Sequence, residues 1–186
     1  MKYAIKEYKD KKLLVAGILG HSMYPPSTKM GYWRFLIPEN FTPHNVLLLG
    51  LGGGTVCKLL LDRFPDVKIV AVEKDTKVAM IAVEHFDLDI KCVKVIFKDA
   101  YQFVNEVREE SFDLIIIDLF VGDWFSYQTI SPIFLNQCKK ILKDNGKIVI
   151  NTINPQWLIN QTFPVTVNKQ KGNIFYTYTK RLDSKV

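Results

Sequence analysis

The stretch that decides the fold is Val46-Leu47-Leu48-Leu49-Gly50-Leu51-Gly52-Gly53-Gly54-Thr55, an apolar run that ends in a glycine-rich turn. Four consecutive apolar residues before the turn are typical of a strand buried on both faces of a sheet. Residues 55–64 then repeat apolar side chains at helical spacing. A strand that passes through glycines into a helix presents backbone N–H groups and the positive end of a helix dipole. The turn is therefore predicted to bind a nucleotide-like ligand.

The alternation of strand and helix continues to residue 151. We expect strands at 45–49, 67–72, 92–97, 112–119 and 147–150, and helices at 55–64, 76–86, 100–107 and 131–142. Thr76 or Asp75 is expected to cap the second helix, and Ser131-Pro132 to open the last one. This order is typical of parallel strands joined by right-handed crossovers. The predicted fold class is α/β, with a doubly wound, mostly parallel sheet.

Two flanking segments complete the predicted fold. Residues 3–8 and 13–19 are expected to form a short N-terminal β-hairpin, followed by a loop over 21–28. Residues 163–167 and 174–179 are expected to form a C-terminal antiparallel hairpin at the sheet edge. Only about a dozen residues lie between the fifth strand and this second hairpin, where a full helix usually sits. We therefore divide the chain into an N-terminal segment, 1–44, and a ligand-binding domain, 45–186.

Composition narrows the class of protein. The 186 residues suffice for one domain with a core. The three cysteines have no metal-ligand or paired spacing, and no signal peptide or membrane span is recognisable, so we expect reduced thiols and a cytoplasmic protein. The net charge of +6 comes from lysines spread along the chain, which speaks against nucleic-acid binding. The isolated histidines predict no metal site.

The spacing of the glycines selects among ligand classes. A phosphate-binding P-loop needs Gly-Lys-Ser/Thr at the helix start, whereas Val56 follows Thr55 here. The dinucleotide pattern G-x-G-x-x-G fails at its last position. The pattern that fits is G-x-G-x-G, formed by Gly50, Gly52 and Gly54, which lets a ligand without a diphosphate approach the backbone.

Polar residues end the following strands. Glu73, nineteen residues after Gly54, ends the second strand and could accept hydrogen bonds from both ribose hydroxyls. Asp99-Ala100 follows the third strand, where an adenine could meet a carboxylate and a backbone N–H. Asp118 follows the fourth, beside the reactive end of the ligand. The carboxyl ends of parallel strands share one edge, so these groups are expected to face one ligand, an adenosyl sulfonium.

Five segments carry a resemblance to a known family: 46–54, 70–75, 98–104, 112–120 and 142–151. They resemble the spermidine synthase-like branch of the class I S-adenosylmethionine-dependent methyltransferase superfamily. The resemblance implies a Rossmann-like methyltransferase fold and S-adenosylmethionine, or its decarboxylated form, as the cofactor. It also implies that Asp118 is catalytic. The cofactor-binding residues expected are Gly50, Gly52, Gly54, Glu73, Lys74, Asp99, Ala100 and Asp118.

Three positions depart from the pattern of the polyamine synthases. The synthases carry an aspartate in the glycine loop that helps hold the aminopropyl amine, and here that residue is Gly53. The position of their second carboxylate after the fourth strand is occupied by Val121 here, and Asp123 follows two residues later. Their Tyr-His pair is replaced by Tyr32-Trp33.

Like these departures, the charge near the predicted mouth of the site speaks against a polyamine synthase. A polycationic substrate requires a strongly acidic site. Here Asp118 and Asp123 are set against His21, Lys29 and Arg34. The sequence thus favours an S-adenosylmethionine-dependent methyltransferase with an unknown small-molecule acceptor.

Two alternatives stay open. One is an aminopropyltransferase that uses decarboxylated S-adenosylmethionine, and the other is a non-catalytic nucleotide-binding or assembly module. For either transfer, Asp118 is the first candidate base, followed by Asp123 and Tyr127. The N-terminal hairpin is a candidate homodimer interface.

Overall fold

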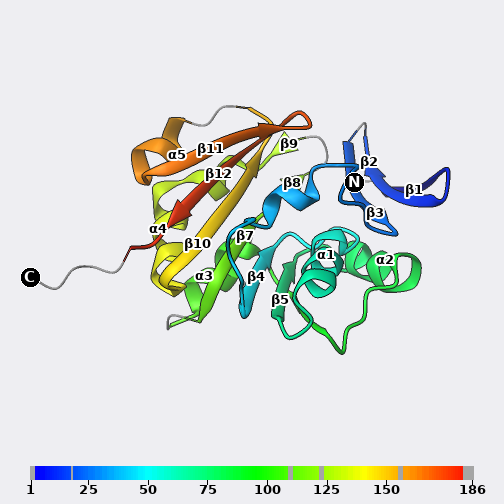
Figure 1. The fold of residues 1–186 in the computed structure, drawn as a ribbon, viewed down its shortest axis with the longest axis horizontal. Coiled ribbons are helices and arrows are strands. Elements are labelled where there is room, and N and C mark those ends of the chain that lie inside the picture. The colour runs from blue at the N-terminus through cyan, green and yellow to red at the C-terminus, as the bar shows by residue number, and fades with distance from the viewer. Residues whose placement is uncertain (1–2, 18, 109–110, 122–123, 155–156, 182–186) are drawn as a thin grey trace, which may run out of the picture.

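The computed structural model describes residues 3–17, 19–108, 111–121, 124–154 and 157–181. A seven-stranded sheet forms the centre of the molecule, and a three-stranded antiparallel sheet made by the N-terminal residues stands beside one end of it (Figure 1). The order of the central strands is β11-β12-β10-β7-β4-β5-β6. Their bounds are β4 Asn45–Leu49, β5 Lys68–Glu73, β6 Val93–Phe97, β7 Phe112–Ile117, β10 Leu142–Thr152, β11 Val165–Gln170 and β12 Asn173–Thr179. The α/β class predicted from the sequence is confirmed.

The strands β4, β5, β6, β7 and β10 run parallel, and among the seven strands only β12 runs in the opposite direction. Parallel ladders join β6 to β5, β5 to β4, β4 to β7 and β7 to β10. Antiparallel ladders add β12 to β10 and β11 to β12. The predicted C-terminal hairpin is therefore present, with its turn at Lys171 and Gly172 and its first strand at Val165–Gln170 rather than 163–167.

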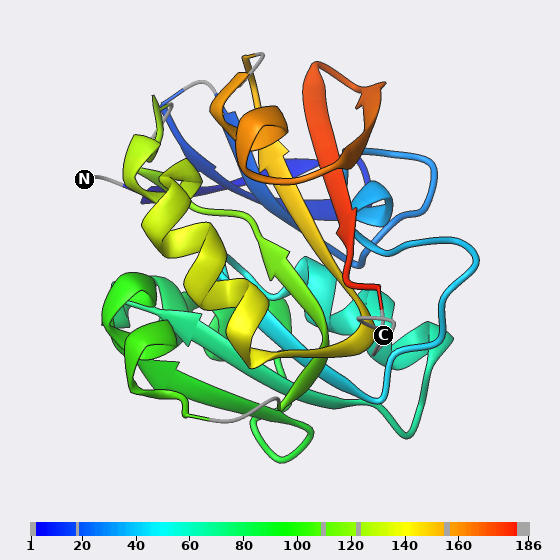
Figure 2. The same ribbon diagram turned by 90° about the vertical axis from the view of Figure 1, so that its left-hand side faces the viewer.

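Helices cover both faces of this sheet (Figures 1 and 2). The helices are α1 Thr55–Arg63, α2 Thr76–Phe86, α3 Ala100–Glu106, α4 Pro132–Ile141 and the short α5 Trp157–Thr162. The side chain of Asp75 accepts a hydrogen bond from the Lys77 N–H, and that of Ser131 accepts one from Phe134, so both predicted caps are confirmed. α5 occupies part of the stretch for which no full helix was expected.

Alternate residues of the buried strands belong to two separate cores. Leu48 and Ile116 pack on the α1 and α2 side, whereas Leu49 and Ile117 pack on the α3 and α4 side. Because side chains alternate across a strand, a strand with a helix layer on each face needs apolar residues at every position. This is the physical reason for the continuous apolar runs in the sequence.

The N-terminal prediction needs a correction. The structure has three strands, β1 Tyr3–Tyr8, β2 Lys11–Ala16 and β3 Leu19–Tyr24, where the sequence predicted a hairpin followed by a loop. Leu14 of β2 packs with Val78 and Phe86 of α2, which anchors the small sheet on the large one. Residues 21–24 of the expected loop are therefore strand, and they lie next to the glycine turn.

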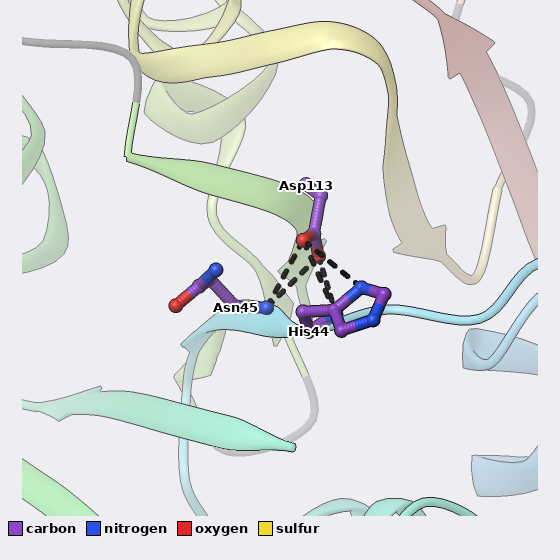
Figure 3. A network of polar contacts seen from close by, with 3 residues as sticks. All are labelled: His44, Asn45 and Asp113. Atoms are coloured by element: carbon purple, nitrogen blue, oxygen red, sulfur yellow. Dashed lines mark hydrogen bonds and ion pairs between the residues drawn. The ribbon is translucent and has the colours of Figure 1, made fainter. Parts of the chain in front are cut away.

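At the amino end of the parallel strands, the side chain of Asp113 on β7 is hydrogen-bonded to the start of β4. Both of its carboxylate oxygens accept hydrogen bonds from the backbone N–H groups of His44 and Asn45, at 3.0 and 3.1 Å (Figure 3). The contact fixes the start of β4 beside β7, far from the glycine turn at the other end. Within the part of the chain that the structure describes, no helix is long and apolar enough to cross a membrane.

Candidate active site

A cleft lies at the carboxyl ends of the parallel strands, where the sequence predicts the ligand. Seven of the eight predicted cofactor-binding residues line it: Gly50, Gly52, Glu73, Lys74, Asp99, Ala100 and Asp118. The eighth, Gly54, is the N-cap of α1 and lies against Leu88 instead. The N-terminal sheet and the segment after it contribute Tyr3, His21, Ser22, Tyr32 and Trp33 to the lining.

The glycine turn brings β4 and β7 close together. Gly50 has a φ of +95°, and a Cβ at this position would lie 2.3 Å from the backbone oxygen of Asp118. The backbone N–H of Asp118 in turn donates to Leu49, at 2.9 Å. A side chain at residue 50 would separate the two strand ends, so glycine is required for the close approach.

The backbone N–H groups of the turn are mostly engaged within the protein. Gly50 donates to Val72, Gly54 to Leu51, Leu51 to the Glu73 carboxylate and Gly53 to the Ser22 hydroxyl. A P-loop, by contrast, directs such N–H groups at phosphates. The turn therefore fits a ligand that has no diphosphate, as the glycine spacing indicated.

Glu73 stands at the end of β5, beside the turn. One carboxylate oxygen accepts from the Leu51 N–H at 3.2 Å and the other from the Asp75 N–H at 3.0 Å. Each carboxylate oxygen can accept more than one hydrogen bond, so both keep capacity for ribose hydroxyls. Tyr3 lines the same cleft, and burial together with the charges of Glu73 and Asp75 raises the pKa of its phenol. Tyr3 is not among the residues that the sequence predicts at this site.

Asp99 and Ala100 lie at the next strand end. The Asp99 side chain caps α3, and its Oδ1 accepts from the N–H groups of Tyr101 and Gln102 at 2.9 and 3.4 Å. The carboxylate is exposed and lines the cleft, whereas Ala100 is buried. Contact of this pair with adenine stays a prediction.

Asp118 lies on the opposite side of the turn, just after β7. Asn151 Nδ2 donates to its Oδ1 at 2.8 Å, and the Tyr32 hydroxyl donates to its Oδ2 at 3.1 Å. Burial raises the pKa of Asp118 to about 6, although the two hydrogen bonds act to lower it. A carboxyl with a pKa near 6 is mostly ionised at neutral pH and can accept a proton.

The Tyr32 phenol is not a second base. Its burial and the neighbouring charge of Asp118 raise its pKa well above 10, so it stays protonated and donates to the carboxylate. The rings of Tyr32 and Trp33 lie 5.0 Å apart, and Tyr32 also packs on Phe175 of β12 at 6.4 Å. These aromatic contacts fix the phenol over Asp118.

The N-terminal sheet is attached directly to the glycine turn. Ser22 accepts from the Gly53 N–H at 2.6 Å, and the Thr55 hydroxyl both accepts from the Met23 N–H at 2.7 Å and donates to the Met23 oxygen at 3.0 Å. A Cβ on Gly53 would lie 2.8 Å from the Ser22 Cβ and 3.0 Å from the Phe86 ring. The space for a side chain at residue 53 is therefore filled.

Other predicted residues lie away from the described lining. Tyr127, in the 3-10 helix Tyr127–Ile130, is 66% exposed and does not line the cleft. Lys29 and Arg34 are exposed and outside the lining too, whereas His21 lines the cleft together with Lys74 and Lys98. Asp123 lies outside the described residues.

Asn151 is the contact residue that the sequence analysis did not single out. It follows the apolar run 148–150 of β10, as Asp118 follows that of β7. The rule that polar residues at strand ends face the ligand could have found it. Ser22 gave no such signal, because its role depends on a contact with residue 53.

Known proteins resemble this chain in both sequence and fold. A polyamine aminopropyltransferase of Clostridioides difficile (strain 630) is 34% identical over 143 residues, which cover 73% of this chain and 50% of the relative. An eEF1A lysine and N-terminal methyltransferase homolog of Drosophila melanogaster is 28% identical over 160 residues, 80% of this chain and 24% of the relative. The chain thus spans half or less of the length of these curated relatives.

Two solved structures share the fold. A spermidine synthase in complex with the transition state analogue AdoDATO has a TM-score of 0.73 at 19% identity, over 97% of this chain and 71% of the other. Human methyltransferase-like protein 13 in complex with SAH has a TM-score of 0.66 at 23% identity, over 77% and 75%. The Rossmann-like methyltransferase fold implied by the sequence is confirmed. The model of the spermine/spermidine synthase domain matches residues 35–181, and the chain therefore belongs to that family.

Proposed function

We propose that the protein transfers an alkyl group from an adenosyl sulfonium nucleoside to a nitrogen nucleophile, with Asp118 as the proton acceptor. The observation that carries the proposal is the position of the Asp118 carboxylate. It lines the same cleft as the glycine turn and Glu73, and two side-chain donors hold it in place. The names of both relatives, an aminopropyltransferase acting on polyamines and a methyltransferase acting on lysine and N-termini, agree with a nitrogen acceptor.

The strand order assigns different roles to the residues on the two sides of β4. β5 and β6 lie on one side of β4 and bring Glu73 and Asp99, which would hold the ribose and the adenine. β7 lies on the other side and brings Asp118 to the acceptor. The sulfonium supplies an activated carbon and a leaving group that departs as a neutral thioether.

The chain's own contribution is placement and proton transfer. The nitrogen lone pair forms the new C–N bond while the C–S bond breaks toward sulfur, and the nitrogen gives one proton to the Asp118 carboxylate. A water-poor cleft lowers the pKa of an ammonium group and raises that of a carboxyl, which brings the two closer together. The raised pKa of Asp118 therefore helps it to accept the proton.

Aminopropyl transfer from decarboxylated S-adenosylmethionine is the first candidate reaction. The comparisons support it better than the methyl transfer that the sequence favoured, because the spermine/spermidine synthase domain model matches residues 35–181 and a polyamine aminopropyltransferase is 34% identical. The cleft agrees on one point. Lys29 and Arg34, which would repel a polycation at the mouth, are not part of its lining, whereas Lys74 and Lys98 are.

Methyl transfer from S-adenosylmethionine is the second candidate, and residue 53 favours it. Ser22 and Phe86 fill the space beside Gly53, so this turn has no room for a carboxylate that would bind an aminopropyl amine. The relatives include a methyltransferase homolog as well.

Calorimetry tests the proposal and separates the two donors. S-Adenosylmethionine, its decarboxylated form and methylthioadenosine are titrated into the wild type, Glu73→Gln and a control, Glu84→Gln, whose carboxylate is exposed on α2. We expect binding in the wild type and the control. In Glu73→Gln we expect a loss of roughly tenfold or more, since hydrogen bonds to a charged group contribute about 1.5–3 kcal/mol. Absence of binding by all three nucleosides would rule out both transfer reactions.

Turnover then identifies the transferred group. Each donor that binds is incubated with putrescine and with lysine-containing peptides, and products are followed by mass spectrometry. A propylamine adduct with the decarboxylated donor supports the first candidate, and a methyl adduct with S-adenosylmethionine supports the second. Binding without either product would leave a non-catalytic nucleoside-binding module.

A further inference from the structure

Asn151 stands beside Asp118 because of the register between two parallel strands. Ile150 of β10 pairs with Ile117 of β7. The residues that follow this pair are Asn151 on β10 and Asp118 directly after β7, so they lie side by side. Asn151 is fully buried, and its Nδ2 lies 2.8 Å from Asp118 Oδ1. The strand pairing itself therefore delivers a hydrogen-bond donor to the carboxylate.

Asn151 places a polar amide at a fully buried position. Its Oδ1 is buried and has no hydrogen-bond partner among the residues that the structure describes. A buried polar atom without a partner is unfavourable, so the contact with Asp118 is the feature that accounts for an amide here. Asn151 does not line the cleft, so it acts on the reaction through Asp118.

The orientation of the amide depends on the charge of Asp118. With the carboxylate ionised, Nδ2 donates to it, whereas a flipped amide would bring two oxygens together. The Tyr32 phenol, the one described titratable group in contact with the carboxylate, donates to Oδ2 at 3.1 Å and reaches Oδ1 at 3.4 Å. The other described neighbours bring no charge, since Gly50 follows β4 and the chain after Asp118 continues with Leu119 and Phe120.

We infer that Asn151 is a positioning residue that holds Oδ1 of Asp118 and favours the ionised form of the carboxyl, which takes the proton of the acceptor. The catalytic part of this inference rests on the proposed function. The coupling between the two side chains does not, and it can be measured without any turnover.

The first measurement uses the wild-type protein. NMR follows the Asp118 carboxyl carbon and the Asn151 side-chain amide through a pH titration. We expect both signals to change with one common midpoint, because the amide donates to the group that titrates. An Asn151 amide that does not respond at the Asp118 midpoint would overturn the inference, whether or not any donor is used.

The second measurement removes the amide donor. In Asn151→Leu, similar in shape, and in Asn151→Ala, the Asp118 midpoint should rise by about one pH unit, since a hydrogen bond to the charged form is lost. The control is Thr152→Val, which removes the next buried polar side chain of β10, whose hydroxyl donates to Asn154 and Ile174. It should leave the midpoint in place. An unchanged midpoint in either folded Asn151 variant contradicts the inference.

The third measurement applies if the proposed transfer is observed. In the pH profile of kcat, the midpoint of the acid limb should rise in the Asn151 variants by the same amount as the Asp118 midpoint. KM for the nucleoside should change less than about threefold. A rise in KM with an unmoved acid limb would instead indicate a purely structural role. If no transfer occurs with any donor, the proposed function fails and the two NMR titrations still decide the coupling.

Discussion

Asp113 and Asp118 carry the same side chain at opposite ends of one strand, yet their surroundings differ. Asp113 accepts hydrogen bonds from the backbone N–H groups of His44 and Asn45, which exist whatever side chains stand there (Figure 3). Asp118 accepts from the side chains of Tyr32 and Asn151, and burial raises its pKa to about 6. Backbone donors make a fixed structural contact, whereas side-chain donors around a buried carboxyl set its affinity for protons.

The largest expected effect is the loss of transfer in Asp118→Asn. The amide keeps the size of the carboxylate but cannot accept a proton, and general-base catalysis contributes about 10²- to 10⁴-fold. We expect the transfer rate to fall by that factor while nucleoside affinity changes less than about threefold. Stopped-time product assays and calorimetry measure the two quantities. A variant that keeps more than about a third of the wild-type rate would exclude Asp118 as the base.

The next effect is on stability, and its sign should differ between the two aspartates. The pKa of Asp118 is raised from 3.8 to about 6 in the folded state, so its ionisation disfavours folding above pH 6. This cost fades as the pH falls from 6 toward 4, because the carboxyl is then protonated in the folded state as well. Asp118→Asn should therefore raise the free energy of unfolding at pH 7.5 by up to about 3 kcal/mol, with little gain near pH 4. Urea unfolding at both pH values checks this, and a loss of stability at pH 7.5 would contradict it.

Asp113→Ala should act in the opposite direction. It removes the carboxylate acceptor of two backbone N–H groups, an exposed one at His44 and a partly buried one at Asn45, which costs about 1–3 kcal/mol. Thermal or urea unfolding measures the loss, with the exposed helical Asp62→Ala as the control. Nucleoside affinity should stay at the wild-type level, because Asp113 lies at the other end of the sheet. Weaker binding in a folded Asp113→Ala protein would show that the two ends are coupled.

The smallest effect is expected from Tyr32→Phe. The variant removes one donor to the ionised carboxylate, so the pKa of Asp118 should rise by about half a unit. The transfer rate, which requires the ionised form, should then reach half its maximum at a pH about half a unit higher. Tyr8→Phe, at an exposed position outside the cleft, serves as the control. A downward shift in Tyr32→Phe would mean that the phenol does not stabilise the carboxylate.

Much of the fold could be predicted because its signals are local. The run Leu114-Ile115-Ile116-Ile117 is apolar at every position, which is typical of a strand with a helix layer on each face. β3 was missed because His21 and Ser22 near its middle and the prolines after it interrupt the apolar pattern. Its stability as a strand comes from the pairing with β2 and from the hydrogen bonds of Ser22 and Met23 to the glycine turn.

The candidate site likewise has residues that the sequence predicts and contacts that only the tertiary structure creates. The strand order places Gly50, Glu73, Asp99 and Asp118 at one edge, and the structure brings them into one cleft. Asn151 reaches Asp118 through a strand register, and Ser22 reaches Gly53 across 31 residues, so neither contact follows from a local pattern. The filled space at Gly53 likewise depends on Phe86 of α2.

By itself, the sequence determined the family, the alternation of parallel strands and helices along the chain and the ends of those strands that carry polar groups. These features depend on hydrophobic periodicity and glycine spacing, which act over a few residues. The tertiary structure decided which partners those groups have, how far the Asp118 carboxyl is buried and whether the turn has room for another side chain. The physical reason is that proton affinity depends on burial and on donors brought from distant strands.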